Sequence, residues 1–279
     1  MLGSLDCAVS ALDQFQQDLN VTANNIANVN TVGFKAANVN FADTFSNVMG
    51  TTVAAGSMQV GTGVMTSSIT NQFTQGAISN TGAPNNLAIN GNGFFTVSDP
   101  TTGATYATQD GTFSVDQNGY LVTSNGMQVQ GYSDAGLTTP GPIKIDATGA
   151  PGGATGNIAG YSFGANGEVK VTITDPTTNA TTTFVRGQIL LQNYSSPQNL
   201  VKAGNNLYTN LANAQPLTTA VTPGTNNLGT IESGALELSN VDLAGQLASL
   251  IVTQRGYEAN AKVITTSDEL LQTINNLKR

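Results

Sequence analysis

The two ends of this 279-residue chain carry the strongest periodic pattern in its sequence. Near the C-terminus, side chains recur at alternating steps of four and three from Leu243 to Leu271, and the N-terminal residues from Leu5 to Val29 repeat that spacing. Such spacing lines side chains along one stripe of a helix, and a stripe sustained over several turns calls for a partner. The sequence therefore predicts two long helices that pair with each other.

The predicted stripes define what we call the assembly seam. Its members are Leu5, Ala8, Leu12, Phe15, Leu19, Thr22, Ile26 and Val29, and then Leu243, Leu247, Leu250, Gln254, Tyr257, Ala261, Ile264, Asp268 and Leu271. We expect helices over residues 3–29 and 240–279, with Ser239 or Asn240 as N-cap of the second. The outer face of the first is polar but almost uncharged, which favours a helix packed among copies of itself.

Charged residues make up only 9% of the chain, and none lies between Asp43 and Asp99. The net charge of −8 argues against nucleic acid as a partner, because its phosphates demand basic patches. The chain has no histidine, which excludes Ser-His-Asp and Cys-His catalysis and any His-ligated metal. Cys7 is the only cysteine, so no internal disulfide can form.

The sequence also predicts neither a membrane span nor a secretory signal. No run of 18 or more apolar residues occurs, so we expect no membrane span. The N-terminal residues contain Asp6, Asp13 and Asp18 and lack the basic and apolar regions of a secretory signal. We therefore expect a cytosolic protein, or one exported by a route that reads another feature.

The middle of the chain has the composition of an antiparallel β body. Short runs of Thr, Val, Ile and Phe alternate with Asn-Gly and Asp-Gly dipeptides, which supply the positive φ angles of tight hairpins. The dipeptides lie at 90–91, 92–93, 110–111, 118–119 and 125–126. Strands are predicted at 112–116, 120–122, 127–130, 168–174, 182–185 and 188–192.

The connecting segments give weaker signals. The spacing of Phe41, Phe45 and Val48 predicts a short helical turn, and residues 50–63 have the composition of a loop or extended arm. Residues 133–160 and 203–229, rich in glycine, proline or other turn formers, are also predicted to be loops.

Together these patterns predict an α+β fold, with long N- and C-terminal helices paired as a coiled-coil-like base that carries a mainly antiparallel β body. The predicted domain division has three parts. Residues 1–33 and 232–279 form the helical domain, residues 34–132 and 166–231 form the β body, and residues 133–165 form a short Gly/Pro-rich insertion.

No arrangement of residues predicts catalysis. The turn at residues 91–95 lacks the following helix and the Lys-Ser/Thr that a phosphate-binding loop requires. Asp268 and Glu269 are adjacent, but neighbours on a helix point about 100° apart and share no site. We therefore expect no enzyme activity, no cofactor and no metal site.

Several motifs are long enough to identify a family. The N-terminal motif consists of Asn24, Asn25, Ile26, Ala27 and Asn28, followed by Gly33, Phe34 and Lys35. Further motifs lie at residues 87–95, 111–122, 239–243 and 251–271. Together these motifs resemble those of the bacterial flagellar rod and hook proteins. The last helix and its ending at 276–279 resemble the hook protein more than the distal-rod protein.

The resemblance implies a structural subunit that leaves the cell through the flagellar export apparatus without a cleaved signal and polymerises helically with copies of itself. Its other partners would be the flagellar axial proteins: rod, hook cap and hook–filament junction. The terminal helices would form an inner tube and the β body an outer wall. The resemblance favours the hook, the universal joint that transmits torque from motor to filament.

Other interpretations remain open. Hook proteins usually carry a sizeable outer domain, and residues 133–165 are too few for one, so the chain's size resembles the distal rod. A surface adhesin with a glycan-binding β body would need aromatic or carboxylate clusters, and aromatics are few. A carboxylate-only glycosidase needs two facing acids, whereas the acids here are sparse and lie mostly in turns or terminal helices.

Overall fold

The computed structural model describes residues 2–52, 56–151, 156–176, 180–217 and 220–277. They form two compact units. The helical unit comprises Met1–Val29, Ala36–Gln72 and Val241–Arg279, and the β unit comprises Asn30–Lys35 and Phe73–Asn240. Paired terminal helices and a mostly antiparallel β body confirm the predicted α+β class. The units group residues 36–72 with the helices, whereas the predicted three-part domain division, which concerns the assembled protein, stays a prediction.

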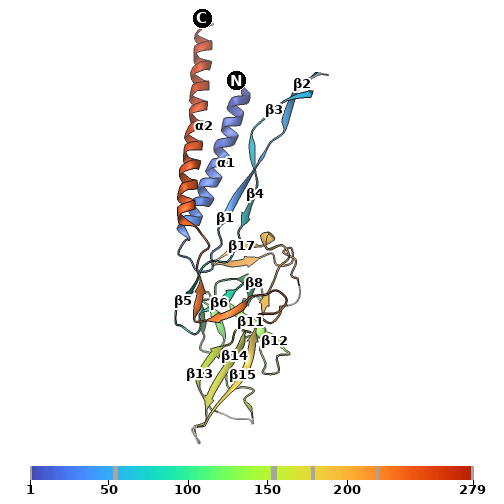
Figure 1. Cartoon of the computed structure of the whole chain (residues 1–279), viewed down its shortest axis with the longest axis vertical. Coiled ribbons are helices and arrows are strands. Elements are labelled where there is room, and N and C mark those ends of the chain that lie inside the picture. Colours follow the sequence, from blue (N-terminus) through green and yellow to red (C-terminus); the bar gives the residue numbers. More distant parts are fainter. Residues whose placement is uncertain (1, 53–55, 152–155, 177–179, 218–219, 278–279) are drawn as a thin grey trace. The chain divides into compact units, whose positions relative to one another are not determined.

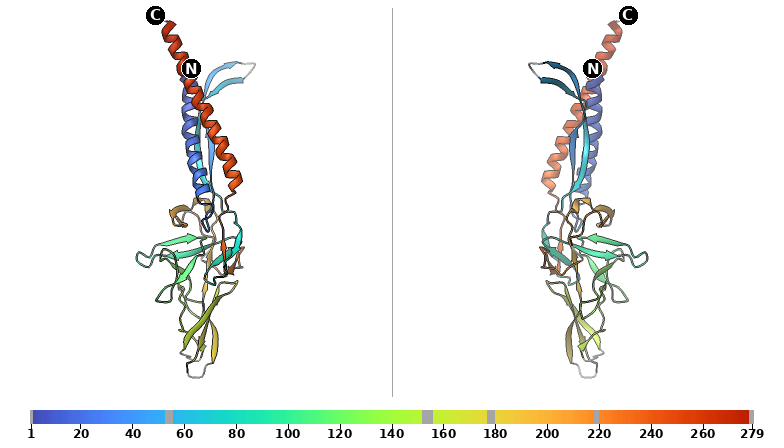
Figure 2. Two further views of the ribbon diagram at one scale, coloured as in Figure 1. Left: turned by 90° about the vertical axis from the view of Figure 1, so that its left-hand side faces the viewer. Right: turned by 90° about the vertical axis from the view of Figure 1, so that its right-hand side faces the viewer.

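Two long helices dominate the helical unit, α1 (Leu2–Ala27) and α2 (Leu243–Leu277). They run side by side in opposite directions, so that both chain ends lie at the same end of this unit (Figures 1 and 2). The N-cap prediction of Ser239 or Asn240 is wrong. Asp242 caps α2 instead, because its Oδ1 accepts the N–H of Ala244 at 3.1 Å.

A long β ribbon accompanies the helices, formed by β1 (Ala37–Asp43) with β4 (Val64–Asn71) and by β2 (Ser46–Thr52) with β3 (Gly56–Gly61). The predicted helical turn at Phe41, Phe45 and Val48 is therefore wrong. For residues 50–63 the sequence offered a loop or an extended arm, and the described residues form an extended two-stranded arm, so the loop alternative is wrong. Residues 53–55 lie outside the described part of the chain. A short helix is stable only when its apolar face packs against another element. Phe45 is 91% exposed, so a helix at this place would have no such packing.

Hydrogen bonds join this ribbon to α1. The hydroxyl of Thr66 on β4 lies within hydrogen-bond distance of the side-chain carbonyls of Gln14 and Gln17 on α1, which share its one proton. One turn away, the hydroxyl of Ser10 accepts the backbone N–H of Val64 at 3.4 Å. The uncharged glutamines on the outer face of α1 thus serve as hydrogen-bond acceptors for a strand.

In the β unit a 12-stranded antiparallel sheet has the path β13-β14-β15-β11-β7-β8-β18-β17, with β9, β10, β12 and β16 joined to its side. Its strands are β7 (Phe94–Ser98), β8 (Thr105–Thr108), β9 (Phe113–Val115), β10 (Leu121–Thr123), β11 (Gln128–Tyr132), β12 (Pro140–Pro142), β13 (Asn157–Phe163), β14 (Glu168–Thr174), β15 (Thr181–Ile189), β16 (Leu191–Gln192), β17 (Val201–Gly204) and β18 (Leu207–Thr209). Two further pairs are β6 (Leu87–Asn90) with β19 (Thr230–Ser233) and β5 (Ile78–Asn80) with β20 (Ala235–Glu237).

Of the five Asn-Gly and Asp-Gly dipeptides predicted to form hairpin turns, two do so. Gly119 and Gly126 have φ of +86° and +78°, and they turn β9 into β10 and β10 into β11. The dipeptides at 90–93 and 110–111 instead join strands that do not pair with each other. At Gly111 the reason for glycine is close packing, since an added Cβ would lie 1.6 Å from the carbonyl oxygen of Leu87.

Both long predicted loops contain strands. Residues 133–160 include β12 and the start of β13, and Ile143 and Ile145 beside them are buried in the core. Residues 203–229 include β18 and the end of β17. The loop prediction is wrong at these places, because the glycine and proline content of the segments hides short strands. These strands pair with their neighbours in the sequence, β12 with β11, β13 with β14 and β17 with β18.

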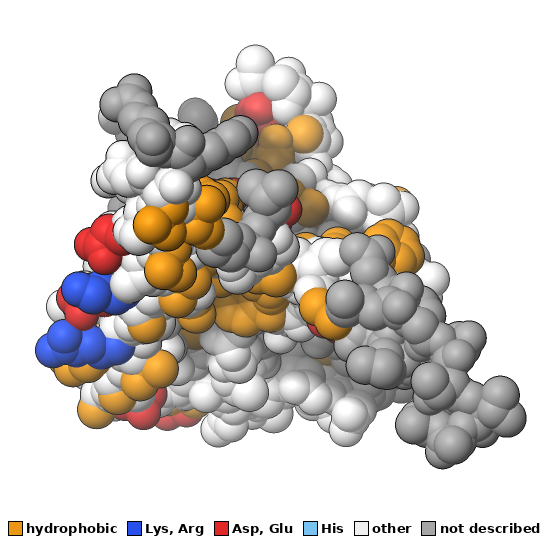
Figure 3. Space-filling view, turned by 90° about the horizontal axis from the view of Figure 1, so that it is seen from above, with side chains coloured by type: hydrophobic (Ala, Val, Ile, Leu, Met, Phe, Trp, Pro, Cys, Tyr) orange, Lys and Arg blue, Asp and Glu red, His pale blue; other side chains and the backbone are white. Residues whose placement is uncertain are grey.

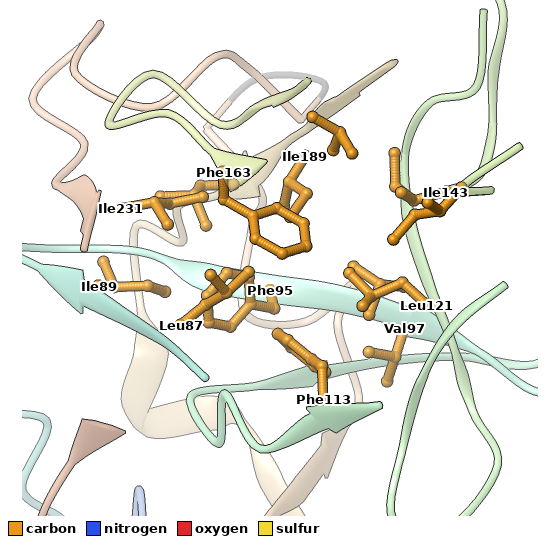
Figure 4. Close-up of a cluster of buried hydrophobic side chains, with 14 of the residues drawn as sticks. Leu87, Ile89, Phe95, Val97, Phe113, Leu121, Ile143, Phe163, Ile189 and Ile231 are labelled. Carbon is orange, nitrogen blue, oxygen red and sulfur yellow. The ribbon is translucent and has the colours of Figure 1, made fainter. Parts of the chain in front are cut away.

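The main core lies within the β unit, where side chains from many strands meet (Figure 4). Phe95 and Phe113 pack edge to face with ring centroids 5.1 Å apart. Leu87 and Ile89 from β6 and Ile231 from β19 extend this cluster. A second cluster around Phe94 and Tyr208 is also built from edge-to-face aromatic rings.

A buried ion pair joins three separate segments of the β unit. Lys35 Nζ lies 2.7 Å from Glu237 Oε1, and the two side chains are only 1% and 3% exposed. Lys35 also donates to the carbonyl of Thr74 at 2.9 Å, while the N–H of Gly76 donates to Glu237 Oε1 at 2.7 Å. The pair thereby connects residues 30–35, 73–76 and β20.

Removing one partner of this pair should destabilise the β unit strongly. Glu237→Gln and Lys35→Met should each lower the free energy of unfolding by about 3–5 kcal/mol, because each leaves an uncompensated buried group. Urea unfolding followed by circular dichroism measures this. Lys170→Met is the control, since Lys170 forms an exposed pair with Glu168 at 3.5 Å and should cost below about 1 kcal/mol. Equal losses in buried and exposed variants would contradict the prediction.

A second charged cluster secures the segment after β12. Arg186 on β15 lies 2.5 Å from Asp146 Oδ1 through Nε and donates through Nη1 to the carbonyl of Ser133. Lys144 Nζ lies 3.3 Å from Asp146 Oδ2. Burial by itself raises the pKa of the Asp146 carboxyl, but the hydrogen bond and charge of Arg186 outweigh it and hold that pKa below 3.8.

Stability should depend on this carboxylate at low pH. Because the folded-state pKa of Asp146 is depressed, its contribution is complete well above the ordinary value of 3.8 and is lost as the pH falls through the folded-state pKa. Asp146→Asn should therefore be less stable than the wild type at pH 7, and the difference should shrink between about pH 5 and pH 2. Thermal unfolding across this range is the measurement. In an Arg186→Met background the pH dependence should flatten, and an unchanged dependence would refute the assignment.

Candidate assembly site

The contact between α1 and α2 includes two polar pairs. Thr253 donates to Asp18 Oδ2 at 2.7 Å, and Asn25 donates to Gln246 Oε1 at 3.1 Å. One turn beyond the Asp18–Thr253 pair the helices approach closely, since a Cβ added at Gly256 would lie 2.9 Å from the ring of Phe15. The pairing of 15 with 256 and of 25 with 246 confirms the antiparallel arrangement.

On α2 the observed contact is offset from the predicted stripe by one residue at every second position. Leu250, Ala261 and Ile264 are half-buried and belong to both. The other positions in the contact are Gln246, Thr253, Asn260 and Ser267, which stand one residue before the predicted Leu247, Gln254, Ala261 and Asp268. Within one chain, the predicted pairing of Leu247, Gln254 and Asp268 with α1 is therefore wrong.

The physical reason is the polar character of α1 at the contact. Asp18 and Asn25 need hydrogen-bonding partners when buried, and leucine offers none. Polar residues recur every seven positions in the sequence, at 246, 253, 260 and 267. A search for apolar periodicity does not detect them. All eight members of the predicted stripe on α1 are buried or half-buried in the single chain.

The offset leaves much of the apolar surface of α2 facing outward. Exposed large apolar side chains on this helix are Leu243, Leu247, Ile251, Val252, Tyr257, Val263, Leu270, Leu271, Ile274 and Leu277. Ile251, Val252 and Leu277 are 58%, 71% and 81% exposed. Seen from above, hydrophobic side chains gather in a patch beside charged ones (Figure 3). An exposed apolar surface of this extent is typical of an interaction site.

The C-terminal part of α2 also extends past the beginning of α1 (Figure 1). Four of its apolar side chains, Leu270, Leu271, Ile274 and Leu277, are 41–81% exposed. A helix without tertiary contacts is marginal in water, so this end can gain stability from another chain.

The N-terminal motif has a structural role in each unit. In the helical unit Asn25 is 1% exposed, and its side chain bonds both the N–H and the carbonyl of Ala37, at 3.0 and 2.8 Å. Asn28 donates to Asn24 at 2.9 and 3.0 Å and closes the last turn of α1. Ile26 is half-buried and Ala27 exposed.

In the β unit, Gly33, Phe34 and Lys35 form a buried strip. Gly33 has φ of +66°, and a Cβ there would lie 2.9 Å from the backbone nitrogen of Asp110, so only glycine fits. Lys202 Nζ lies 4.3 Å from the centre of the Phe34 ring and donates to the carbonyl of Lys35 at 2.9 Å. Burial lowers the pKa of Lys202.

The site is built for packing and hydrogen bonding. Among the described residues, no three His, Cys, Asp or Glu side chains cluster as metal ligands would. Within the same residues, no helix is long and apolar enough to cross a membrane.

Three family models match the sequence. "Flagella basal body rod protein" matches residues 5–35, "Flagellar hook protein FlgE/F/G D1 domain" matches residues 88–171, and "Flagellar basal body rod FlgEFG protein C-terminal" matches residues 232–277. The first contains the whole N-terminal motif, and the last contains α2.

Relatives extend the match over the full length. The flagellar basal-body rod protein FlgG of Bacillus subtilis is 37% identical over 286 residues, covering 100% of both chains. FlgG of Caulobacter vibrioides is 33% identical and covers 99% of each. The flagellar hook protein FlgE of Escherichia coli is 27% identical over 409 residues, covering 97% of this chain and 99% of the relative. The chain therefore belongs to the family of flagellar basal-body rod and hook proteins.

Proposed function

We propose that this chain is a rod subunit of the flagellar basal body, most similar in role to the distal rod, and that it polymerises with copies of itself. The observation that carries the proposal is its end-to-end match to basal-body rod proteins of nearly equal length. The alignment to the hook protein spans 409 positions, far more than the 279 residues of this chain, so the hook protein has extra sequence that this chain lacks.

The last helix resembles the hook protein more than the distal-rod protein, whereas the comparisons favour the alternative, the distal rod. Residues 133–165 support the rod as well. They contribute β12, β13 and the core residues Ile143 and Phe163 to the main sheet, rather than a separate outer domain.

Self-assembly through α2 is supported by the apolar surface that the single chain leaves uncovered. Each large apolar side chain that becomes buried contributes about 1.5–3 kcal/mol, so several buried at one interface can drive polymerisation. Predicted seam residues such as Leu243, Leu247 and Leu271 then serve contacts between subunits. The other partners in this proposal are further flagellar axial proteins and the export apparatus.

Electron microscopy of the purified protein at increasing concentration tests the proposed identity. A rod subunit should form straight tubes, because a rod is a drive shaft, whereas a hook subunit should form curved ones. Curved tubes would refute the rod assignment. A monomer at every concentration would count against both, and would favour a binding module of another kind.

A pair of adjacent variants tests the role of α2. Leu247→Asn should raise the critical concentration for polymerisation roughly tenfold or more, since the buried leucine is worth at least about 1.5 kcal/mol. Ala248→Asn, at the neighbouring exposed position, should change it little. Sedimentation measures polymer formation, and monomer circular dichroism should be alike in the two variants. Equal effects on assembly would rule out a specific apolar contact at Leu247.

A further inference from the structure

A pocket of about 110 Å³ lies within the β unit beside the Lys35–Glu237 pair. Gln109 and the turn from Gly91 to Gly93 also line it. The lining combines backbone and side-chain polar groups with the rings of two phenylalanines. A volume of this size has room for a few water molecules, each of which occupies about 30 Å³ in the liquid.

Gln109 presents an unsatisfied acceptor in this lining. The side chain is 6% exposed, and its Nε2 donates to the carbonyl of Gly93 at 3.1 Å. This bond sets the orientation of the amide, because the reverse orientation would bring two carbonyl oxygens together. Oε1 of Gln109 is the one buried side-chain oxygen or nitrogen without a hydrogen-bond partner in the described part of the chain. Buried polar atoms rarely lack a hydrogen-bond partner.

The neighbouring ion pair has both a donor and an acceptor to offer. An ammonium group carries three N–H donors, and Lys35 uses two of them, on Glu237 Oε1 and on the carbonyl of Thr74. The two donors to Glu237, Lys35 and Gly76, both reach Oε1. The pocket therefore suits a species that donates to Gln109 Oε1 and can also accept from Lys35 or donate to Glu237.

We propose that this pocket is a structural water site, in which an ordered water bridges Gln109 Oε1 to the Lys35–Glu237 pair. Water supplies two donors and an acceptor and commonly makes three hydrogen bonds when buried. A cation is disfavoured by the ammonium of Lys35 in the lining, and an anion by the Glu237 carboxylate and the Gln109 oxygen. An apolar occupant would leave Oε1 unpaired. The inference is independent of assembly.

Crystal structures of the full chain and of Gln109→Met test the site directly. The wild type should show a water peak about 2.7–3.2 Å from Gln109 Oε1, also within bonding distance of Lys35 or Glu237. Gln109→Met should lose that peak and keep the ion pair. A protein donor on Oε1, a bound ion, or a pocket without ordered density at high resolution would overturn the proposal.

Thermal unfolding gives a second readout with a matched control. Gln75 also lines the pocket, and its Nε2 donates to the carbonyl of Ile89 at 3.0 Å, but its side chain is exposed. Both Gln→Met changes remove one amide–carbonyl bond, and only the change at Gln109 removes an acceptor bridged by buried water. The midpoint should fall several degrees further for Gln109→Met than for Gln75→Met. An equal fall, or a rise caused by removing an orphaned acceptor, would overturn the proposal.

Discussion

The buried pair of Lys35 and Glu237 is the interaction on which the organisation of the β unit depends. The segments that it joins, residues 30–35, 73–76 and β20, lie outside the 12-stranded sheet. Burying two charges is favourable only with good geometry and complete hydrogen bonding, so the pair allows few alternative arrangements. Gly33, which donates its N–H to the carbonyl of Glu237 at 2.8 Å, fits the same constraint.

The helical unit mixes polar and apolar side chains at its helix contact. Amphipathic helices normally turn their whole apolar stripe toward their partner. Here Asp18, Asn25, Gln246 and Thr253 bond across the contact, while many leucine, isoleucine and valine side chains of α2 face outward. The hydrogen bonds fix the register of the pairing, and much of the apolar surface of α2 stays uncovered in the single chain.

Rod and hook relatives differ from each other in length, whereas both match this chain at its terminal helices. Rod and hook relatives both match the chain across both ends, because the helices and the N-terminal motif are shared. What differs is the middle. In this chain the segment around 133–165 is used to complete the main sheet, and Ile143 and Ile145 are part of its core.

The sequence by itself determined the two helices, the α+β class, the hairpin at Asn118-Gly119 and the family, since these follow from local periodicity, turn chemistry and contiguous motifs. Tertiary structure decided the rest. It placed Lys35 opposite Glu237, made β12 and β13 out of a Gly/Pro-rich segment, and moved the helix contact from Leu247 to Gln246. The ion pair and the helix contact depend on which distant residues meet and on buried polar atoms finding partners, and neither property is encoded in the spacing of apolar residues along one segment. The strands β12 and β13 pair with their sequence neighbours β11 and β14, but their composition resembles that of a loop.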